Sequence, residues 1–289
     1  MNKFTASALA CLGLFFGAFV WSLPAPAQIL TSDEIHHWNL DPRNNSNGYM
    51  LGYITTLGLD GQYFYETLEG QIQLGYSSSD AVATDPDCTA ELSSQLFSKT
   101  KMPLLPAETD AIGRRCSTVT NPRGFSSGDL SMNKQLAGRK GGPVLMYYQD
   151  FMVTTWARTH TIIKKVWTVS GDRPLPALSM ESYEGIALAQ VLRHQKTSVD
   201  GRFVDASIRG TIRENFQVTI QVGPSGNNFI DMNVLSEKLF DFIVECMATG
   251  RYLRISYYEI YDFQNIFARL LESMRTNYRI YRVDVIGPK

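Results

Sequence analysis

Two short stretches decide the fold: Gln71-Ile-Gln-Leu-Gly75 and Thr219-Ile-Gln-Val-Gly223. Each is a β-rich run that ends in glycine. After an intervening segment, each is followed by an aliphatic strand that ends in two tyrosines, Leu145-Met-Tyr-Tyr148 and Ile255-Ser-Tyr-Tyr258. Self-similarity of this kind is the signature of a repeated unit. The sequence therefore predicts two divergent copies of one small β-rich module, with the tyrosine pairs at equivalent positions.

The two copies are predicted to share one order of elements. In each, early β runs are followed by a helix and two further strands. The helices are expected over Leu130–Ala137, capped by Asp129, and over Val234–Thr249, capped by Asn233. This order is typical of a small OB-type barrel, although an open α+β sheet with its helix on one face fits nearly as well. We therefore predict an α+β, β-rich fold of two tandem OB-like barrel modules, each with a helix before its Tyr-Tyr strand.

The predicted boundaries divide the chain into five parts. They are a signal peptide (1–27), a polar lead-in (28–48), a first module (49–169), a linker with a connector helix at Tyr183–Gln195 (170–200), and a second module (201–289). In the first module we expect strands at Tyr49–Leu57 and Gln62–Leu68, joined by a turn at Gly58–Gly61, and a third strand at Gln71–Leu74.

An insertion at 76–127 carries two of the three cysteines outside the signal peptide, Cys88 and Cys116. It is rich in Ser, Thr, Asp and Pro, and a loop of this length is rare unless it is tied down or functional. Cys246 instead falls on the apolar stripe of a predicted helix. In an exported protein this arrangement predicts a Cys88–Cys116 disulfide and a buried Cys246 thiol.

The first residues have the pattern of an export signal. Lys3 precedes the apolar stretch Ala6–Leu23, and Ala25 and Ala27 are small residues at the positions that a signal peptidase reads. Cleavage before Gln28 would give a periplasmic or secreted protein. An uncleaved segment of this length could instead span a bilayer, which would give an inner-membrane anchor facing the periplasm and the only predicted membrane contact.

Part of the first module resembles a known family. The matching stretches are Gly48-Tyr-Met-Leu-Gly52-Tyr-Ile, Gly58-Leu-x-Gly61, Glu66-Thr-Leu-Glu-Gly70-Gln-Ile-Gln-Leu-Gly75 and Val144–Tyr148. They resemble a family of small uncharacterised bacterial proteins, membrane-anchored or exported, with a β-rich domain and a Thr-Trp-Glu-Gly-x-Leu-like signature. Leu68 stands where that family has Trp, and the cysteine-bearing insertion is extra. The resemblance implies an exported β domain and no reaction.

Charge and motifs exclude several function classes. Without residues 1–27 the chain keeps 26 basic and 28 acidic residues, which predicts no nucleic-acid partner. No catalytic constellation, phosphate loop, metal-ligand spacing or cofactor fingerprint is present, so we predict no catalytic residue, no metal and no cofactor. Gly124-Phe-Ser-Ser-Gly128 resembles a nucleophile elbow only loosely, and a turn is expected there.

The candidate ligand-binding residues are the two tyrosine pairs, Tyr147 with Tyr148 and Tyr257 with Tyr258. Alternation along a strand predicts that each module buries one tyrosine and presents the other, although packing is the competing interpretation. We predict an exported non-enzymatic interaction or structural protein of the bacterial envelope, such as a component of a periplasmic assembly, with a protein partner there. The alternative is a periplasmic hydrolase or small-ligand-binding protein with a site under the Cys88–Cys116 loop.

Overall fold

The computed structural model describes residues 29–30, 32–39, 44–62, 65–76, 122–139, 142–152, 157, 159–186, 196–209, 215–223, 228–259 and 278–287. Residues 31–289 form one compact unit and residues 1–30 another; the elements below all lie in residues 31–289. The described part is rich in β-structure, as the sequence predicts. Within it, no helix has the length and apolar character needed to cross a membrane.

The first half of the chain contains α1 (Ser32–Asn39), β1 (Asn44–Gln62), β2 (Tyr65–Leu74), β3 (Pro122–Ser127), α4 (Leu130–Ala137), β4 (Pro143–Phe151) and β5 (Thr161–Thr168). The second half contains β6 (Ser179–Glu181), β7 (Lys196–Arg209), β8 (Asn215–Val222), β9 (Phe229–Val234), α6 (Glu237–Thr249), β10 (Tyr252–Glu259) and β11 (Tyr278–Gly287).

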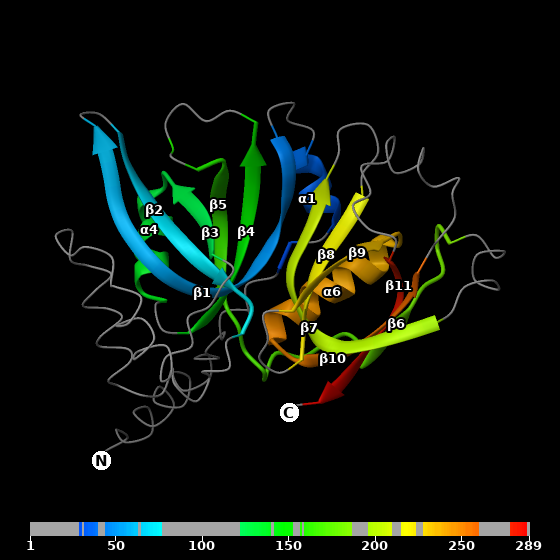
Figure 1. The fold of residues 1–289 in the computed structure, drawn as a ribbon. Coiled ribbons are helices and arrows are strands. Elements are labelled where there is room, and N and C mark those ends of the chain that lie inside the picture. The colour runs from blue at the N-terminus through cyan, green and yellow to red at the C-terminus, as the bar shows by residue number, and fades with distance from the viewer. Residues whose placement is uncertain are drawn as a thin grey trace, which may run out of the picture. The chain divides into compact units, whose positions relative to one another are not determined.

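Two sets of five strands each close on themselves. In the first ring, β1 pairs with β2, β2 with β3, β3 in parallel with β5, β5 with β4, and β4 again with β1. In the second ring, β7 pairs with β8, β8 with β9, β9 in parallel with β11, β11 with β10, and β10 again with β7. Antiparallel pairing of β1 with β7 joins the rings into one sheet of eleven strands, in which β6 pairs with β11 (Figure 1).

The first strand of each ring bends at a glycine. Gly52 of β1 lies opposite residues of both β2 and β4, and Gly201 of β7 lies opposite residues of both β8 and β10. A Cβ atom on Gly52 would lie 1.8 Å from the carbonyl oxygen of Gln73, and one on Gly201 would lie 2.3 Å from that of Gln221. Only glycine allows the backbones to approach this closely.

The two glycine-ended stretches occupy the same place in the two rings. Gly75 and Gly223 follow β2 and β8 with φ angles of 85° and 84°. The Gly75 amide donates a hydrogen bond to Leu51 (2.9 Å) and the Gly223 amide to Asp200 (3.1 Å), and each acceptor directly precedes a bend glycine. The division of the chain into two separate domains stays a prediction.

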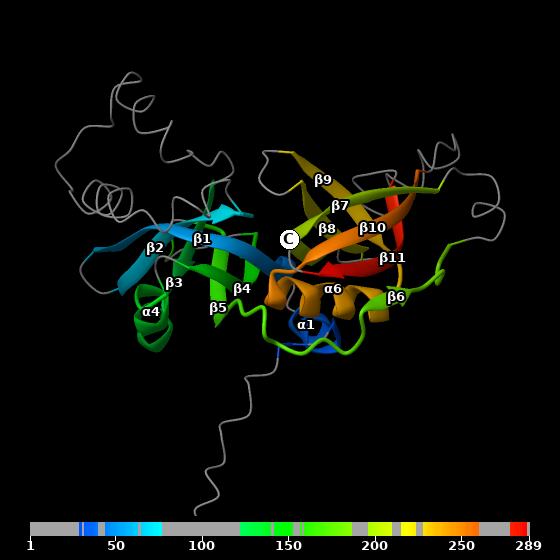
Figure 2. The ribbon, with the colours of Figure 1, turned by 90° about the horizontal axis from the view of Figure 1, so that it is seen from below.

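The helices follow the strands in the predicted order, between β3 and β4 and between β9 and β10. The Asp129 cap of α4 is confirmed, since its carboxylate accepts from the Ser131 amide at 2.7 Å. Helix α6 begins later than predicted, with Ser236 as its N-cap, because Asn233 belongs to β9. Helix α1 packs on α6, β1 and β7 (Figure 2).

The interior of the first ring is apolar. Its buried side chains are Met50, Ile54, Leu68, Ile72, Leu74, Phe125, Met132, Leu136, Val144, Met146, Tyr148, Ile163 and Val166. Gly70 gives space to one of them, because a Cβ atom there would lie 2.4 Å from the Phe125 ring.

Several predicted boundaries in the first module are wrong. Strand β1 continues through Gly58–Gly61, and β2 continues through Gly70, because hairpin pairing supports both strands past their glycines. The third strand is β3, which lies inside the predicted insertion. Its sequence is polar and lacks the β-branched residues by which the other strands were predicted. The predicted lead-in holds α1 and the start of β1.

The predicted linker and connector helix also need correction. Residues 183–186 form a turn with Gly185 at a φ angle of 72°, and strand β7 already begins at Lys196. The rest of the expected helix lies outside the described residues. The predicted signal peptide, Cys88 and Cys116 lie outside them as well.

The bend glycines give the first prediction. Gly52→Ala and Gly201→Ala should each lower the free energy of unfolding by roughly 1–3 kcal/mol or more, because the added methyl group overlaps a neighbouring strand. Gly58→Ala lies in the same strand as Gly52, has no atom within 4 Å of its added Cβ, and is the matched control. Denaturant unfolding measures all three, and equal midpoints would contradict the proposed role of the bends.

Candidate binding groove

Two rows of polar residues cross the outer face of the second ring. The register of β7, β8 and β9 places Asp205, Thr219 and Asp231 in one row and Ser207, Gln217 and Asn233 in the next. Alternate residues of a strand share a face, so the apolar residues between them, such as Val218 and Ile220, are buried. The result is a polar face of three strands above an apolar interior.

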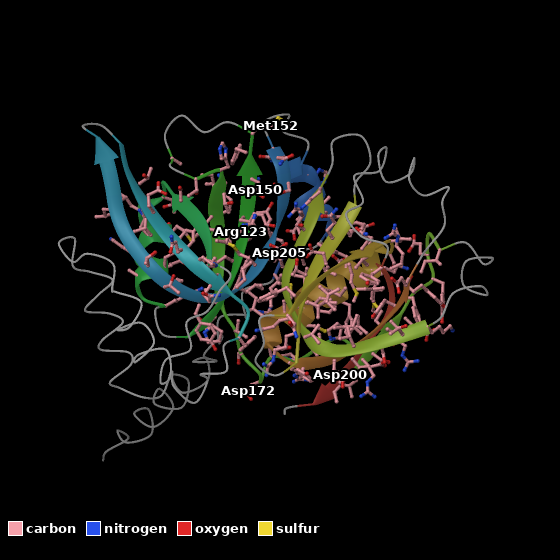
Figure 3. The ribbon with its side chains drawn as sticks, viewed as in Figure 1. Arg123, Asp150, Met152, Asp172, Asp200 and Asp205 are labelled. Atoms are coloured by element: carbon pink, nitrogen blue, oxygen red, sulfur yellow. The ribbon has the colours of Figure 1, made fainter. Side chains whose placement is uncertain are left out.

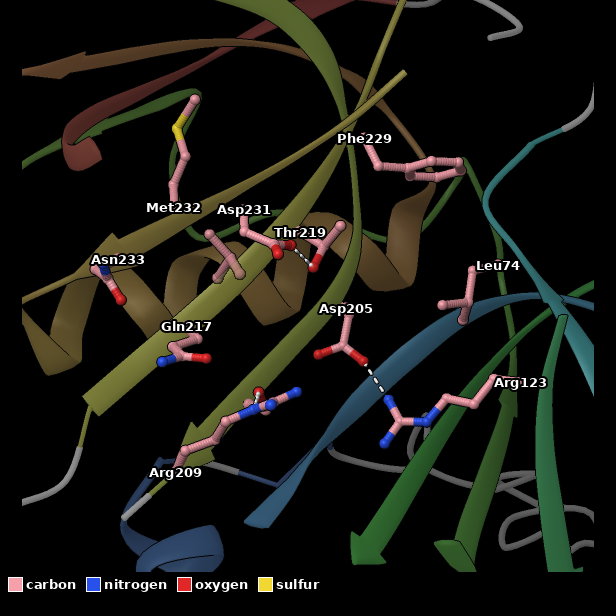
Figure 4. A pocket seen from close by; sticks show the side chains of 12 residues that line it. Leu74, Arg123, Asp205, Arg209, Gln217, Thr219, Phe229, Asp231, Met232 and Asn233 are labelled. Carbon is pink, nitrogen blue, oxygen red and sulfur yellow. Dashed lines mark hydrogen bonds and ion pairs between the residues drawn. The ribbon is translucent and has the colours of Figure 1, made fainter. Parts of the chain in front are cut away.

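A cavity of about 270 Å³ lies over this polar face. Leu74 and Arg123 of the first ring also line it, so the cavity is a groove between the two rings (Figure 4). Arg209 of β7 and Phe229 of β9 also line the groove.

Arg123 connects the rings at the wall of this groove. It lies opposite Ile72 in the register of β3 with β2 and therefore shares the inner face of the first ring. Its guanidinium donates to Asp150 of β4 at 2.9 Å and to Asp205 of β7 at 2.7 Å. It also lies 4.1 Å from the centre of the Tyr148 ring. Figure 3 shows Arg123, Asp150 and Asp205 close together.

Further hydrogen bonds hold both carboxylates in place. Asp150 accepts from the Ser46 hydroxyl at 2.7 Å and from the Thr161 hydroxyl at 2.6 Å. The hydroxyl of Tyr148 donates to Asp205 at 3.1 Å. Because buried charges are costly unless paired and hydrogen-bonded, this cluster is a rigid structural connection.

Burial is the largest single influence on the pKa of Asp205, Tyr148 and Arg123. It raises the pKa of the Asp205 carboxyl above its ordinary value, and the positive charges of Arg123 and Arg209 lower the pKa by less. Burial likewise raises the pKa of the Tyr148 hydroxyl. For the Arg123 guanidinium, burial lowers the pKa, but Tyr148, Asp205 and Asp150 together raise it by more, so Arg123 stays charged.

The predicted tyrosines are placed differently from expectation. Tyr147 and Tyr148 are both buried, so the prediction that each pair presents one tyrosine is wrong for the first module. Tyr148 points into the first ring, whereas Tyr147 packs outside it, 5.5 Å from the ring of Tyr49. In the second module Tyr258 is buried and Tyr257 is half-buried.

The two tyrosine pairs are also one residue out of register. The irregularity in the β4–β5 pairing falls between Tyr147 and Tyr148, and one of the two in the β10–β11 pairing falls between Ser256 and Tyr257. Tyr148 therefore corresponds to Tyr257, and the expected equivalence of Tyr147 with Tyr257 is wrong. Of the four tyrosines, only Tyr148 touches the groove's Arg123 and Asp205 among the contacts described.

Ser126 is neither in a turn nor available as a nucleophile. It lies in β3, is fully buried, and donates a hydrogen bond to Glu69. Cys246 is a buried free thiol, and burial raises its pKa to about 12. The described residues contain no group of three or more His, Cys, Asp or Glu side chains that could hold a metal ion.

Sequence reasoning missed the groove residues. A signal was present in Phe203-Val-Asp-Ala-Ser-Ile208, where a carboxylate interrupts a buried strand. Charged residues are rarely buried unless paired, so Asp205 required a cation, but its partner Arg123 is 82 positions away.

Comparisons with known proteins identify no family for the chain. No family model matches the chain, and no curated protein matches it. One similar solved structure is the wild-type single-stranded DNA binding protein from Thermus aquaticus. It shares 9% identity, and the alignment covers 86% of this chain and 95% of that chain with a TM-score of 0.20. A similarity at this level assigns no function.

The comparison corrects the predicted partners. From composition we predicted a protein partner in the cell envelope and excluded nucleic acid. The exclusion of nucleic acid is corrected, since the similar structure is named as a single-stranded DNA binding protein, whereas the protein partner stays a prediction. Net charge is an average over the chain, whereas recognition depends on the charges of one face, so a balanced net charge does not exclude a nucleic-acid partner.

Removal of the Arg123 cation should destabilise the chain strongly. Arg123→Leu leaves Asp150 and Asp205 buried without their shared partner, which should lower the free energy of unfolding by about 3–5 kcal/mol. Arg254→Leu is the matched control, because Arg254 pairs with Asp200 across strands at an exposed position. Chemical denaturation should show a far smaller change for the control. Equal losses would mean that the buried cluster contributes nothing special.

The pKa of Asp205 predicts a pH dependence. A raised folded-state pKa means that the folded chain retains a proton which the unfolded chain releases, so stability is lost as the pH rises from the ordinary value of 3.8 through the folded-state value. Asp205→Asn removes this titration. Wild type should therefore lose stability relative to the variant over this window, by up to ~1.4 kcal/mol per pH unit. Urea titrations across pH measure the difference, with exposed Asp172→Asn as control. A wild type that gains stability relative to Asp205→Asn as the pH rises would refute the assignment.

Proposed function

We propose that the chain is an exported, non-enzymatic binding protein, made of two tandem OB-type modules, that takes a polar ligand in the groove between its rings. The observation that carries this proposal is the groove itself, in which two rows of polar side chains face Arg123 across a cavity of about 270 Å³.

The strand pairing supports the OB-type description. In both rings three strands precede a helix and two follow it, and the third strand pairs in parallel with the fifth. An OB fold is a five-stranded Greek-key barrel that binds ligands on the face of its second and third strands. In the second ring these strands are β8 and β9, and both line the groove.

The chemistry of the groove supports binding rather than catalysis. Asp205, its most buried carboxylate, is held by Arg123 and Tyr148 instead of being positioned to accept a substrate proton. Export is supported by the N-terminal pattern of Lys3, the apolar stretch Ala6–Leu23 and the small residues Ala25 and Ala27.

A variant that fills the groove tests the proposal. Thr219→Trp places a large ring on the polar face of β8, whereas Thr197→Trp places the same ring on an exposed position of β7 that does not line the groove. Small saccharides, nucleotides, amino acids and polyamines are screened by thermal denaturation. At least one class should stabilise wild type and Thr197→Trp, by roughly 2.7 kcal/mol at 100 times its Kd, and not Thr219→Trp. If no class binds, or if Thr219→Trp binds equally well, the groove is not the binding site.

A further inference from the structure

The charges that line the groove nearly cancel. Arg123 is shared by two carboxylates, Asp150 and Asp205, so it offers little free positive charge to a ligand. Arg209 and Asp231, on the two outer strands of the polar face, add one charge of each sign. A ligand that carries no net charge is therefore matched to the groove as a whole.

The hydrogen-bonding groups of the groove include both donors and acceptors. Among the hydrogen bonds described, Arg209 donates only through Nε, to Ser207 at 3.3 Å, so its terminal nitrogens remain for a ligand. The exposed carboxylate of Asp231 accepts from Thr219 through Oδ1 at 2.7 Å, which leaves Oδ2 available. A ligand that fits must accept at one end and donate at the other. Neighbouring hydroxyl groups do both.

An aromatic ring lies at one end of this polar surface. Phe229 of β9 is half-buried and lines the cavity, and Figure 4 shows it at the end away from Arg209. An exposed aromatic face packs well against a flat C–H surface, while the polar groups beside it bind the hydroxyls on the ring edge.

The volume of the groove limits the ligand to a small unit. About 270 Å³ is below the ~300–1,000 Å³ typical of sites for drug-sized molecules. A single sugar ring, free or as one residue of a glycan, combines this size with an apolar face and hydroxyl edges. Building on the proposed function, we infer that the groove binds a neutral saccharide unit, with Phe229 packing on the ring and Arg209 and Asp231 binding its hydroxyls.

Isothermal titration with four probe classes tests the inference. The probes are a panel of neutral trisaccharides, the matching monosaccharides, the corresponding sugar phosphates, and an oligothymidylate. At least one neutral sugar should bind, with less than about a twofold change in Kd between low and high salt, because no counterions are released. Tighter binding of the trisaccharide identifies a glycan as the source, and equal binding identifies a free sugar.

Conservative variants locate the contacts. Asp231→Asn and Phe229→Leu should each weaken sugar binding roughly tenfold, since a charge-assisted hydrogen bond or a ring contact is lost. Asp172→Asn, exposed and outside the groove, should leave the Kd unchanged. Circular dichroism melting shows whether each variant is folded.

The outcomes separate the inference from the proposed function. If oligothymidylate or the sugar phosphates bind instead, and Thr219→Trp abolishes that binding, the groove is a ligand site but the saccharide assignment is overturned. Sugar binding that survives Asp231→Asn and Phe229→Leu also overturns it. If no probe binds wild type and the screen of polar ligands is also negative, both proposals fail.

Discussion

The structure depends on the close approach of three backbones at Gly52 and again at Gly201. A five-stranded ring closes only if its first strand is hydrogen-bonded to one neighbour before a bend and to another after it. At both glycines the chain changes neighbours within one or two residues, and the carbonyl of the adjacent strand occupies the volume of a side chain. Ring closure, and with it the position of both helices, follows from this contact.

Because β1 pairs with β7, one face of the continuous sheet lines the interior of the first ring and then the exterior of the second ring. Met50 lies inside the first ring, and its register partner Asp205 lies on the outside of the second. The same surface therefore passes from an apolar interior to a polar exterior at the boundary between the rings. Arg123 lies at this boundary, where the loss of hydration is compensated by two carboxylates and an aromatic ring. The groove and the contact between the rings are made by the same residues.

Local signals predicted the β-rich composition, the positions of the two main helices and the glycine-ended strands. Asp129 is an example, because a cap bonds to residues directly after it. Features that depend on distant pairing were not predictable. Gly58 looked like a turn, yet its pairing with Glu69 keeps it in β1. The two tyrosine pairs lie one residue apart relative to the strand pairing, and a repeated Tyr-Tyr sequence cannot reveal such an offset. Arg123 could not be predicted as the partner of Asp205, because the two residues of an ion pair have no fixed separation in the sequence.

The contact between the rings uses different halves of two corresponding strands. In β1 it involves Ser46–Met50, before the bend at Gly52, whereas in β7 it involves Asp205–Arg209, after the bend at Gly201. A two-fold axis would pair the same half of each strand with itself. Here different halves are paired, so the contact is heterologous. The rings are therefore related head to tail, and the chain has a direction that a symmetric pair of modules would lack. The two rings cannot exchange roles in this contact, because the first contributes residues before its bend glycine and the second contributes residues after its own.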